Sequence, residues 1–414
     1  MNNLRFHDKI VVRIPSLPVT SSEAPDLLDI FLKDKFLSEA LFLASPDLHA
    51  ECARLFNDPD HFSKKDVVRI TQSLLKYYLR MKTRCTPFGL FAGCGCITWG
   101  TENIISVEPG YNRYTRLDMH FQGALSEYLS QQTNLKNNLL FYPNNSLYIL
   151  HDKLRYIEYF YLEKRKEFKI SSVDNSEILE KILQISKNGV LLKDLASSIT
   201  NDEITFEEAF LFVNELTDEQ ILVSEFFPGV TGTDNFEIFK SRIEGLAGKN
   251  DSMQELSEIL SKISKSVKKL DDKILNETEE YENIIKTISH FNIPTDKNKL
   301  FQVDLMRETK GTIERSIAHK IVEIIDLLKP FSINNKNQSL EKFKEKFSER
   351  YEAKEICLPF VLDNETGLGY NRHTSESGAD NILVDDLFLP VVGGSSQIEE
   401  KDRILLSFLI EALN

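Results

Sequence analysis

The chain has 414 residues and a formal net charge of −14, with 41% hydrophobic and 10% aromatic residues. A chain of this length accommodates two or three domains, and its composition excludes wholesale disorder. The acidic balance excludes a surface covered with phosphate-binding side chains, but it leaves room for one local basic patch.

The cysteines and the N-terminus indicate a cytoplasmic protein. Five cysteines are scattered along the chain, and their spacing is not that of the usual metal or redox motifs. Residues 1–13 lack the apolar run of a signal peptide. No stretch approaches the roughly 20 apolar residues of a membrane span. We therefore expect reduced thiols, no metal and no cofactor.

Residues 1–140 predict an N-terminal α+β subdomain. Ser63 followed by Asp66 resembles a capping box, which predicts a helix start. Pro87 ends that helix, and a glycine-punctuated apolar run follows it. The predicted elements are a strand at 10–14, helices at 23–36 and 65–84, and a buried strand at 88–99.

Residues 141–228 have the strand and helix order of a winged helix. The predicted elements are strands at 146–150, 154–162 and 167–171, helices at 176–186, 191–199 and 206–216, and a last strand at 220–224. Residues 229–240 follow Pro228, contain Gly229 and Gly232, and are predicted to be a linker.

Residues 229–414 predict a helix-rich α+β subdomain. The predicted elements are helical segments between 240 and 292, a strand at 300–305, helices at 311–328 and 340–351, a strand at 356–362 and a closing amphipathic helix at 402–414. The whole chain is thus expected to be an α+β protein with several subdomains.

Three basic residues stand four apart on the predicted helix 65–84. Lys76, Arg80 and Arg84 would share one face of that helix. Like charges at this spacing repel by a few tenths of a kcal/mol per pair. Carboxylates from elsewhere in this acidic chain could offset the repulsion. The alternative is a phosphate-bearing ligand, which the planar fork of arginine suits.

The same segment carries a longer pattern. The run Arg80-x-x-x-Arg84-x-Thr86-Pro-Phe-Gly-Leu-Phe-Ala-Gly93 resembles the signature of the lantibiotic dehydratase N-terminal region. Further matches follow in the family's order: Arg116-Leu-Asp118-Met119, Gln302-Val-Asp304-Leu305, Phe347-Ser-Glu-Arg-Tyr351 and Asp363-x-x-x-Gly-Leu-Gly-Tyr370. The resemblance covers residues 75–370, which is most of the chain.

This resemblance implies a reaction and a set of site residues. Glutamate is moved from glutamyl-tRNA, the co-substrate, to Ser and Thr hydroxyls of a ribosomally made precursor peptide, and a separate domain then eliminates it. The resemblance implies that Arg80 and Arg84 bind tRNA phosphates, and Lys76, which shares their predicted helix face, is expected to bind tRNA with them. It implies catalytic roles for Thr86, Asp118 and Asp304. Either aspartate could hold the aminoacyl ammonium or assist the attacking hydroxyl.

In this family a small winged-helix-like domain binds the leader of the precursor. The resemblance implies that the leader adds a strand at the edge 167–171, with apolar side chains in a groove beside the helix 206–216. The residues expected to bind it are Phe168, Phe206, Phe210 and Val213, although each could be ordinary core. The helix carries three glutamates and no basic residue, which argues against reading of DNA.

Members of the family are much longer than this chain. We therefore expect a truncated form, the product of a split gene or a degenerate homologue, and catalysis and leader binding without catalysis both remain open. The resemblance implies several partners: a precursor peptide, glutamyl-tRNA, an elimination or C-terminal subunit, a cyclase, a transporter and a second copy of the chain.

Overall fold

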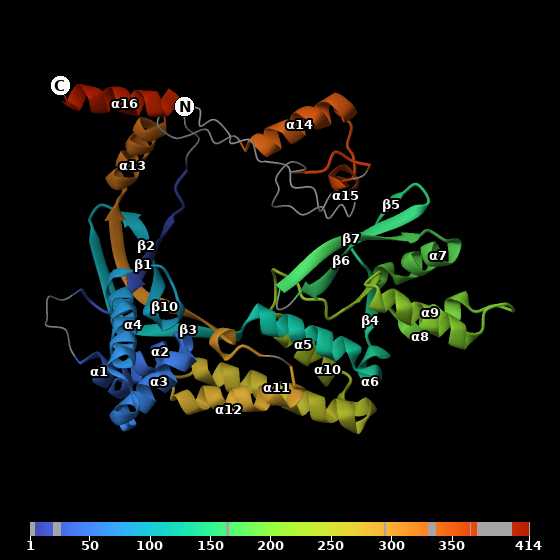
Figure 1. Ribbon diagram of the computed structural model, residues 1–414, viewed down its shortest axis with the longest axis horizontal. Coiled ribbons are helices and arrows are strands. Elements are labelled where there is room, and N and C mark those ends of the chain that lie inside the picture. The colour runs from blue at the N-terminus through green and yellow to red at the C-terminus, as the bar shows by residue number, and fades with distance from the viewer. Residues whose placement is uncertain are drawn as a thin grey trace. The chain divides into compact units, whose positions relative to one another are not determined.

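The computed structural model describes residues 5–19, 26–162, 165–293, 295–329, 337–364, 366–370 and 400–413. The chain divides into two compact units (Figure 1). Unit 1 contains Met1–Pro143 and Ile178–Ile317, and unit 2 contains Asn144–Glu177 and Ala318–Asn414. Helices and strands are mixed in unit 1, as the predicted α+β class requires.

Unit 1 is built on a four-stranded sheet of order β1-β2-β10-β3. Strand β1 pairs antiparallel with β2, β2 pairs parallel with β10, and β10 pairs antiparallel with β3. The strands are β1 (Lys9–Pro15), β2 (Ala92–Gly100), β3 (Ile104–Leu117) and β10 (Phe301–Glu314). The sequence did not predict β3, and it predicted only the first part of β10.

One face of this sheet is covered by helices and forms the main core. Val303 and Leu305 of β10 pack in one buried cluster with side chains from four helices and with Leu90 and Phe91, which directly precede β2. Figure 1 shows these helices gathered beside the sheet. They are α1 (Leu27–Lys33), α2 (Lys35–Ala44), α3 (Pro46–Asn57) and α4 (Lys64–Thr83). Side chains alternate between the two faces of a strand, so the neighbours of Val303 and Leu305 point away from this core.

The helix predicted at 23–36 is in fact two helices that meet at Asp34. This residue has an extended backbone and ends α1. Its side chain also accepts a hydrogen bond from the amide of Leu37 at 3.0 Å and so caps α2. A side chain that competes for backbone amides favours a cap over a helix interior, which explains the break.

The prediction of a helix from residue 311 is wrong in its start, because Gly311 lies in β10. Gly311 has φ of +125°, and a Cβ there would lie 1.9 Å from the carbonyl oxygen of Ile104 on β3. Glycine therefore permits the close approach of the two strands. Helix α13 begins at Arg315 and ends at Leu328.

The remaining elements of unit 1 are a small sheet and further helices. The sheet has the order β8-β4-β9. The elements are α5 (Met119–Gln131), α6 (Thr133–Lys136), β4 (Leu140–Pro143), α7 (Glu177–Ile185), β8 (Val190–Leu191), α8 (Leu192–Ile199), α9 (Phe206–Asp218), β9 (Leu222–Ser224), α10 (Asn235–Glu244), α11 (Asp251–Asp271) and α12 (Thr278–Ile288). The helices predicted between residues 176 and 216 correspond to α7, α8 and α9.

Unit 2 contains an antiparallel sheet of order β5-β6-β7, in which β7 is an edge strand. Its elements are β5 (Tyr148–Leu150), β6 (Lys153–Leu162), β7 (Arg165–Asp174), the main part of α13, α14 (Gln338–Tyr351), α15 (Leu358–Leu362) and α16 (Glu400–Leu413). The predicted strand at 356–362 is wrong. Pro359 stands in the first turn of α15, where its missing N–H is not needed.

Asp363 joins the end of α15 to the β5–β6 hairpin within unit 2. Its carboxylate is fully buried and accepts hydrogen bonds from Tyr148 at 2.6 Å and Arg155 at 2.7 Å. Arg350 donates to the carbonyl oxygens of Thr366 and Gly367 at 3.0 and 3.1 Å. One polar residue from each of the last two family motifs, Arg350 and Asp363, thus holds segments of unit 2 together. In the part of the chain that the structure describes, no helix is long and apolar enough to span a bilayer.

Candidate functional site

Two of the three predicted tRNA-binding residues lie on α4, and the third ends it. The Ser63 side chain starts the helix by accepting a hydrogen bond from the amide of Asp66. Lys76 and Arg80 lie in its second half. Arg84 is the C-cap residue, with φ −109° and ψ 118°. The prediction of one helical stripe is therefore wrong at Arg84, because its backbone has left the helix.

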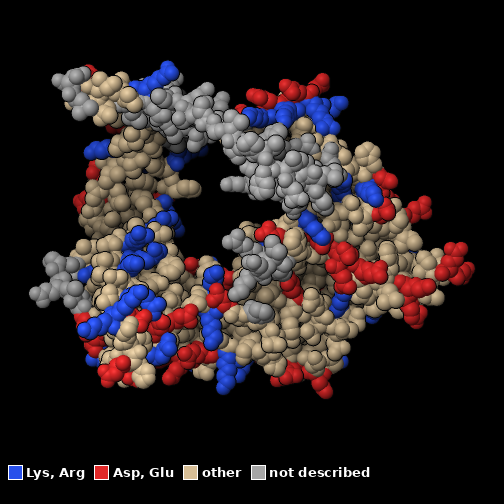
Figure 2. Space-filling model, in the orientation of Figure 1, with Lys and Arg blue, Asp and Glu red and all other residues tan. Residues whose placement is uncertain are grey.

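None of the described carboxylates forms an ion pair with Lys76, Arg80 or Arg84. The ion pair that joins α4 to its neighbour α3 is made elsewhere, between Arg69 and Glu51 at 3.7 Å. Figure 2 shows Lys and Arg side chains gathered over the region of α4. The described part of the chain thus gives these three cations no carboxylate, which favours an anionic ligand as their partner.

Arg80 is held by an aromatic ring. Its Cζ lies 4.7 Å from the centroid of the Phe88 ring, and Phe88 in turn meets Phe91 edge to face at 5.5 Å. Its buried Nε has no hydrogen-bond partner among the described residues. A cation–π contact contributes roughly 0.5–1 kcal/mol at an exposed site. The contact ties the end of α4 to the loop that follows it.

That loop presents Thr86 on the surface and turns at Gly89. Thr86 is exposed. Gly89 has φ of +52°, a left-handed conformation that favours glycine, and it opens a short 3-10 turn (Gly89–Phe91) before β2. Close packing explains Gly93 as well, because a Cβ there would lie 2.7 Å from the carbonyl oxygen of Leu305 on β10. The motif therefore brings its loop to the start of β10.

A pocket of about 240 Å³ lies between this loop, the end of α2 and the start of β10. Eight of its eleven lining residues are apolar or glycine, and the other three, Asn298, Gln302 and Asp304, are polar. The lining residues are Ala40, Leu43, Ala44, Pro87, Phe88, Gly89, Asn298, Phe301, Gln302, Val303 and Asp304. The pocket thus combines two motifs that are more than 200 residues apart in the sequence. Phe88 connects it to Arg80.

Asp304 is paired with Arg116, a residue that was not predicted as part of the site. Arg116 Nη1 lies 2.7 Å from Asp304 Oδ2, and Arg116 Nε donates to Gln302 Oε1 at 3.3 Å. Arg116 stands opposite Gln302 on β3, and Tyr114 stands opposite Asp304. The side chains of Arg116 and Asp304 are 30% and 47% exposed. The signal that could have found Arg116 is its place in the motif that also contains Asp118.

Asp118 has a structural role in this arrangement. It is the N-cap of α5, and its Oδ1 accepts a hydrogen bond from the amide of His120 at 2.8 Å. Its own amide donates to the carbonyl oxygen of Leu300. Asp304 lies four residues after Leu300, the residue that Asp118 contacts. At roughly 3.3 Å per residue in a strand, Asp304 is therefore about 13 Å away along the chain direction. The two aspartates do not form a carboxylate pair.

We expect the Asp118→Asn variant to keep its stability, because asparagine caps helices as well as aspartate does. Asp118→Ala should lower the free energy of unfolding by about 1 kcal/mol. Urea unfolding of both variants measures the difference. An Asn variant as unstable as the Ala variant would show that the carboxylate charge, rather than the cap, stabilises α5.

The residues predicted to bind a leader peptide fall in both units. Phe168 lies on the edge strand β7 of unit 2 and is 64% exposed. Phe206 and Phe210 stack on α9 of unit 1, with ring centroids 5.9 Å apart. Val213, also on α9, is 0% exposed. Its side chain therefore belongs to the core and offers no surface to a peptide in this conformation.

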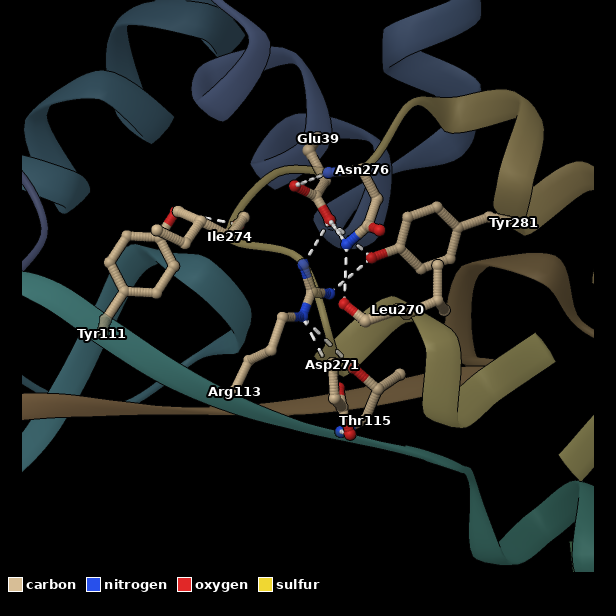
Figure 3. Close-up of polar contacts among 9 residues, drawn as sticks. All are labelled: Glu39, Tyr111, Arg113, Thr115, Leu270, Asp271, Ile274, Asn276 and Tyr281. Carbon is tan, nitrogen blue, oxygen red and sulfur yellow. Dashed lines mark hydrogen bonds and ion pairs between the residues drawn. The ribbon is translucent and has the colours of Figure 1, made fainter. Parts of the chain in front are cut away.

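Strand β3 is anchored by a buried polar network (Figure 3). Arg113 Nη1 donates to Glu39 Oε1 at 2.5 Å, Arg113 Nη2 donates to the Tyr281 hydroxyl, and this hydroxyl donates to Glu39 at 2.6 Å. The backbone N–H of Asn276 donates to Glu39 Oε2 at 3.0 Å. Burial raises the pKa of Tyr281, which keeps its hydroxyl protonated. The network fixes β3, and Arg116 stands three residues further along this strand.

A family model described as "Lantibiotic dehydratase, N terminus" matches residues 33–413. The chain belongs to this lantibiotic dehydratase family. Its relatives include the epidermin biosynthesis protein EpiB of Staphylococcus epidermidis, 25% identical over 383 residues, which are 90% of this chain and 37% of EpiB. The nisin biosynthesis protein NisB of Lactococcus lactis subsp. lactis is 20% identical over 354 residues, which are 84% of this chain and 34% of NisB. The resemblance inferred from the motifs is confirmed.

Solved structures share the fold of this lantibiotic dehydratase region. The tRNA-dependent lantibiotic dehydratase MibB from Microbispora sp. 107891 has a TM-score of 0.73 and 23% identity, and the match covers 87% of this chain and 35% of MibB. The glutamylation domain TbtB from thiomuracin biosynthesis has a TM-score of 0.54 and 16% identity, over 78% of this chain and 39% of TbtB. The chain therefore spans little more than a third of the length of these relatives.

Proposed function

We propose that this chain carries part of a site that transfers glutamate from glutamyl-tRNA to Ser and Thr hydroxyls of a ribosomally made precursor peptide. Membership of the lantibiotic dehydratase family supports this reaction. So do the described relatives, one named a tRNA-dependent lantibiotic dehydratase and another a glutamylation domain. Elimination of the glutamate would be the task of another domain or subunit. We also propose a cytoplasmic location, where glutamyl-tRNA is available.

The observation that carries the proposal is a set of cations beside a pocket that form no ion pair with any described carboxylate. Arg80 lies against Phe88, which lines the pocket, and Arg84 and Thr86 belong to the same short segment. Phosphates of the single-stranded acceptor end would bind Arg80 and Arg84. The terminal nucleotide and its amino acid would then reach the pocket, whose polar groups include Gln302 and Asp304.

The chemistry needs little from the protein beyond positioning. Glutamyl-tRNA is an ester, so its carbonyl carbon is already activated. The oxygen of a Ser or Thr hydroxyl forms a bond to that carbon, the ester bond to the tRNA breaks, and the proton passes to the departing ribose oxygen. Thr86 and Asp304 would orient the reacting groups, and effective molarity would supply much of the rate enhancement.

Binding of glutamyl-tRNA across a salt series tests the proposal. We expect wild-type chain to bind it at low salt, with log K falling linearly against log salt by about 0.7 per phosphate contacted in a single-stranded segment. A bulk tRNA of unrelated sequence, without an amino acid, serves as the control for nonspecific attraction. Well-folded chain that binds neither tRNA, or both equally, would contradict the assignment.

An alternative proposal is a leader-peptide-binding chain with a winged-helix-like region and no catalysis. The exposed edge of β7 favours it, because an edge strand can accept a further strand and Phe168 and Ile170 are 64% and 47% exposed there. Titration of a fluorescent leader peptide separates the two functions. Leader binding that is unchanged when glutamyl-tRNA binding is absent would favour this alternative.

A further inference from the structure

The amino acid on glutamyl-tRNA presents two charged groups. Its α-carboxyl group is esterified, so the free charges are the α-ammonium and the γ-carboxylate. A site that selects glutamate needs an anion for the first group and a cation for the second, placed within one side-chain length of each other. The following inference rests on the proposed function, because it concerns how that same site recognises its amino acid.

The pocket beside the loop that contains Pro87, Phe88 and Gly89 has such a pair at its edge, formed by Asp304 and Arg116. Asp304 lines the pocket, and Arg116 contacts both Asp304 at 2.7 Å and the second polar lining residue, Gln302, at 3.3 Å. Neither side chain is buried, since Arg116 is 30% exposed and Asp304 47%. The two charges are therefore accessible to a ligand, although they are paired with each other in its absence.

The ion pair between Arg116 and Asp304 contributes little to the stability of the sheet. Strands β3 and β10 pair through their backbones, from Phe301 opposite Leu117 to Thr312 opposite Ile104. This backbone pairing sets the register of the two strands without the ion pair. The buried network around Arg113 anchors β3 from the other face. An exposed ion pair contributes about 0–1 kcal/mol to stability. Stability alone therefore does not explain why these two charged residues stand at the edge of the pocket.

We propose that Arg116 recognises the γ-carboxylate of the glutamyl group while Asp304 holds its α-ammonium. The ligand would exchange one ion pair for two, and the site would stay neutral because the bound amino acid carries one charge of each sign. The guanidinium can turn one edge to the γ-carboxylate and keep its contact with Gln302. Arg116 is then the residue that distinguishes glutamate from glutamine, and Arg80 is left for phosphate.

The test compares two ligands that differ in one group. A single tRNA carries either glutamate or glutamine on a 3′-amide, which does not hydrolyse, and affinities are measured for wild type and the Arg116→Gln and Asp304→Asn variants. We expect wild type to prefer the glutamyl form. Arg116→Gln should weaken glutamyl binding by about 10- to 100-fold, because a hydrogen bond to a charged group is lost, and should leave glutaminyl binding nearly unchanged.

Two other variants and a control distinguish the roles of Arg116 and Asp304 from a general effect of charge. Asp304→Asn should weaken both ligands equally, because both carry the ammonium, and Arg116→Lys should restore part of the preference. Arg54→Gln, at an exposed arginine on α3, removes the same charge away from the pocket. Equal weakening of both ligands by Arg116→Gln, or no change in either, would overturn the role of Arg116 while leaving tRNA binding intact. Wild type that binds neither ligand would overturn the proposed function itself.

Discussion

The double variant Arg80→Ala/Arg84→Ala is expected to lose most of the affinity for glutamyl-tRNA. A hydrogen bond to a charged group contributes about 1.5–3 kcal/mol, so each arginine should account for about tenfold or more. The slope of log K against log salt should fall by about 1.4, at roughly 0.7 per phosphate contact in a single-stranded segment. Filter binding of labelled glutamyl-tRNA across a salt series measures both quantities.

A matched control removes two charges elsewhere in unit 1. Lys262 and Lys265 are exposed on α11, and neither has an ion pair within the described ranges. Lys262→Ala/Lys265→Ala should keep the affinity and the slope of wild type. If the control weakens binding as much as Arg80→Ala/Arg84→Ala does, the attraction is a general effect of charge and not a site on α4 and its loop.

Arg113→Met is expected to have the largest effect on stability. The variant leaves the Glu39 carboxylate buried at 0% exposure without its guanidinium partner. Breaking a buried ion pair by removing one partner costs about 3–5 kcal/mol. Urea unfolding should show this loss in the transition of unit 1, and tRNA binding should weaken with it because β3 carries Arg116.

The double variant Glu39→Leu/Arg113→Met separates the charge from the packing. It removes the uncompensated carboxylate, so it should recover part of the stability that Arg113→Met loses. Recovery should be incomplete, because the amide of Asn276 and the hydroxyl of Tyr281 lose their acceptor. An Arg113→Met variant within about 1 kcal/mol of wild type would contradict the importance of this network.

Local patterns predicted the elements on which the site depends. The Ser63 cap and Pro87 placed α4 within one residue of its observed bounds, Lys64–Thr83, and the apolar run predicted as a strand at 88–99 contains most of β2, which is Ala92–Gly100. These signals are local, because a cap or a proline acts within a few residues. The prediction was wrong at Arg84. The four-residue spacing of basic side chains continues to this residue, but its backbone is no longer helical.

The partners of the site residues could not be predicted in the same way. Arg116 and Asp304 are 188 residues apart in the sequence, and Arg113 and Glu39 are 74 apart. Such pairs depend on the order β1-β2-β10-β3, which no short pattern encodes. The family motifs identified Asp118 and Asp304 as important residues, but only the structure distinguishes the helix cap from the carboxylate at the pocket.

The most direct test of the tRNA site is to map where the acceptor end of glutamyl-tRNA lies. A tRNA with a photoreactive azido group on its terminal adenosine is bound at low salt, irradiated and digested, and the attached peptides are identified by mass spectrometry. We expect attachment within residues 76–89 and at the start of β10, and none on the exposed face of α11. Attachment confined to other surfaces would contradict the assignment of Arg80, Arg84 and the neighbouring pocket as the site that binds glutamyl-tRNA.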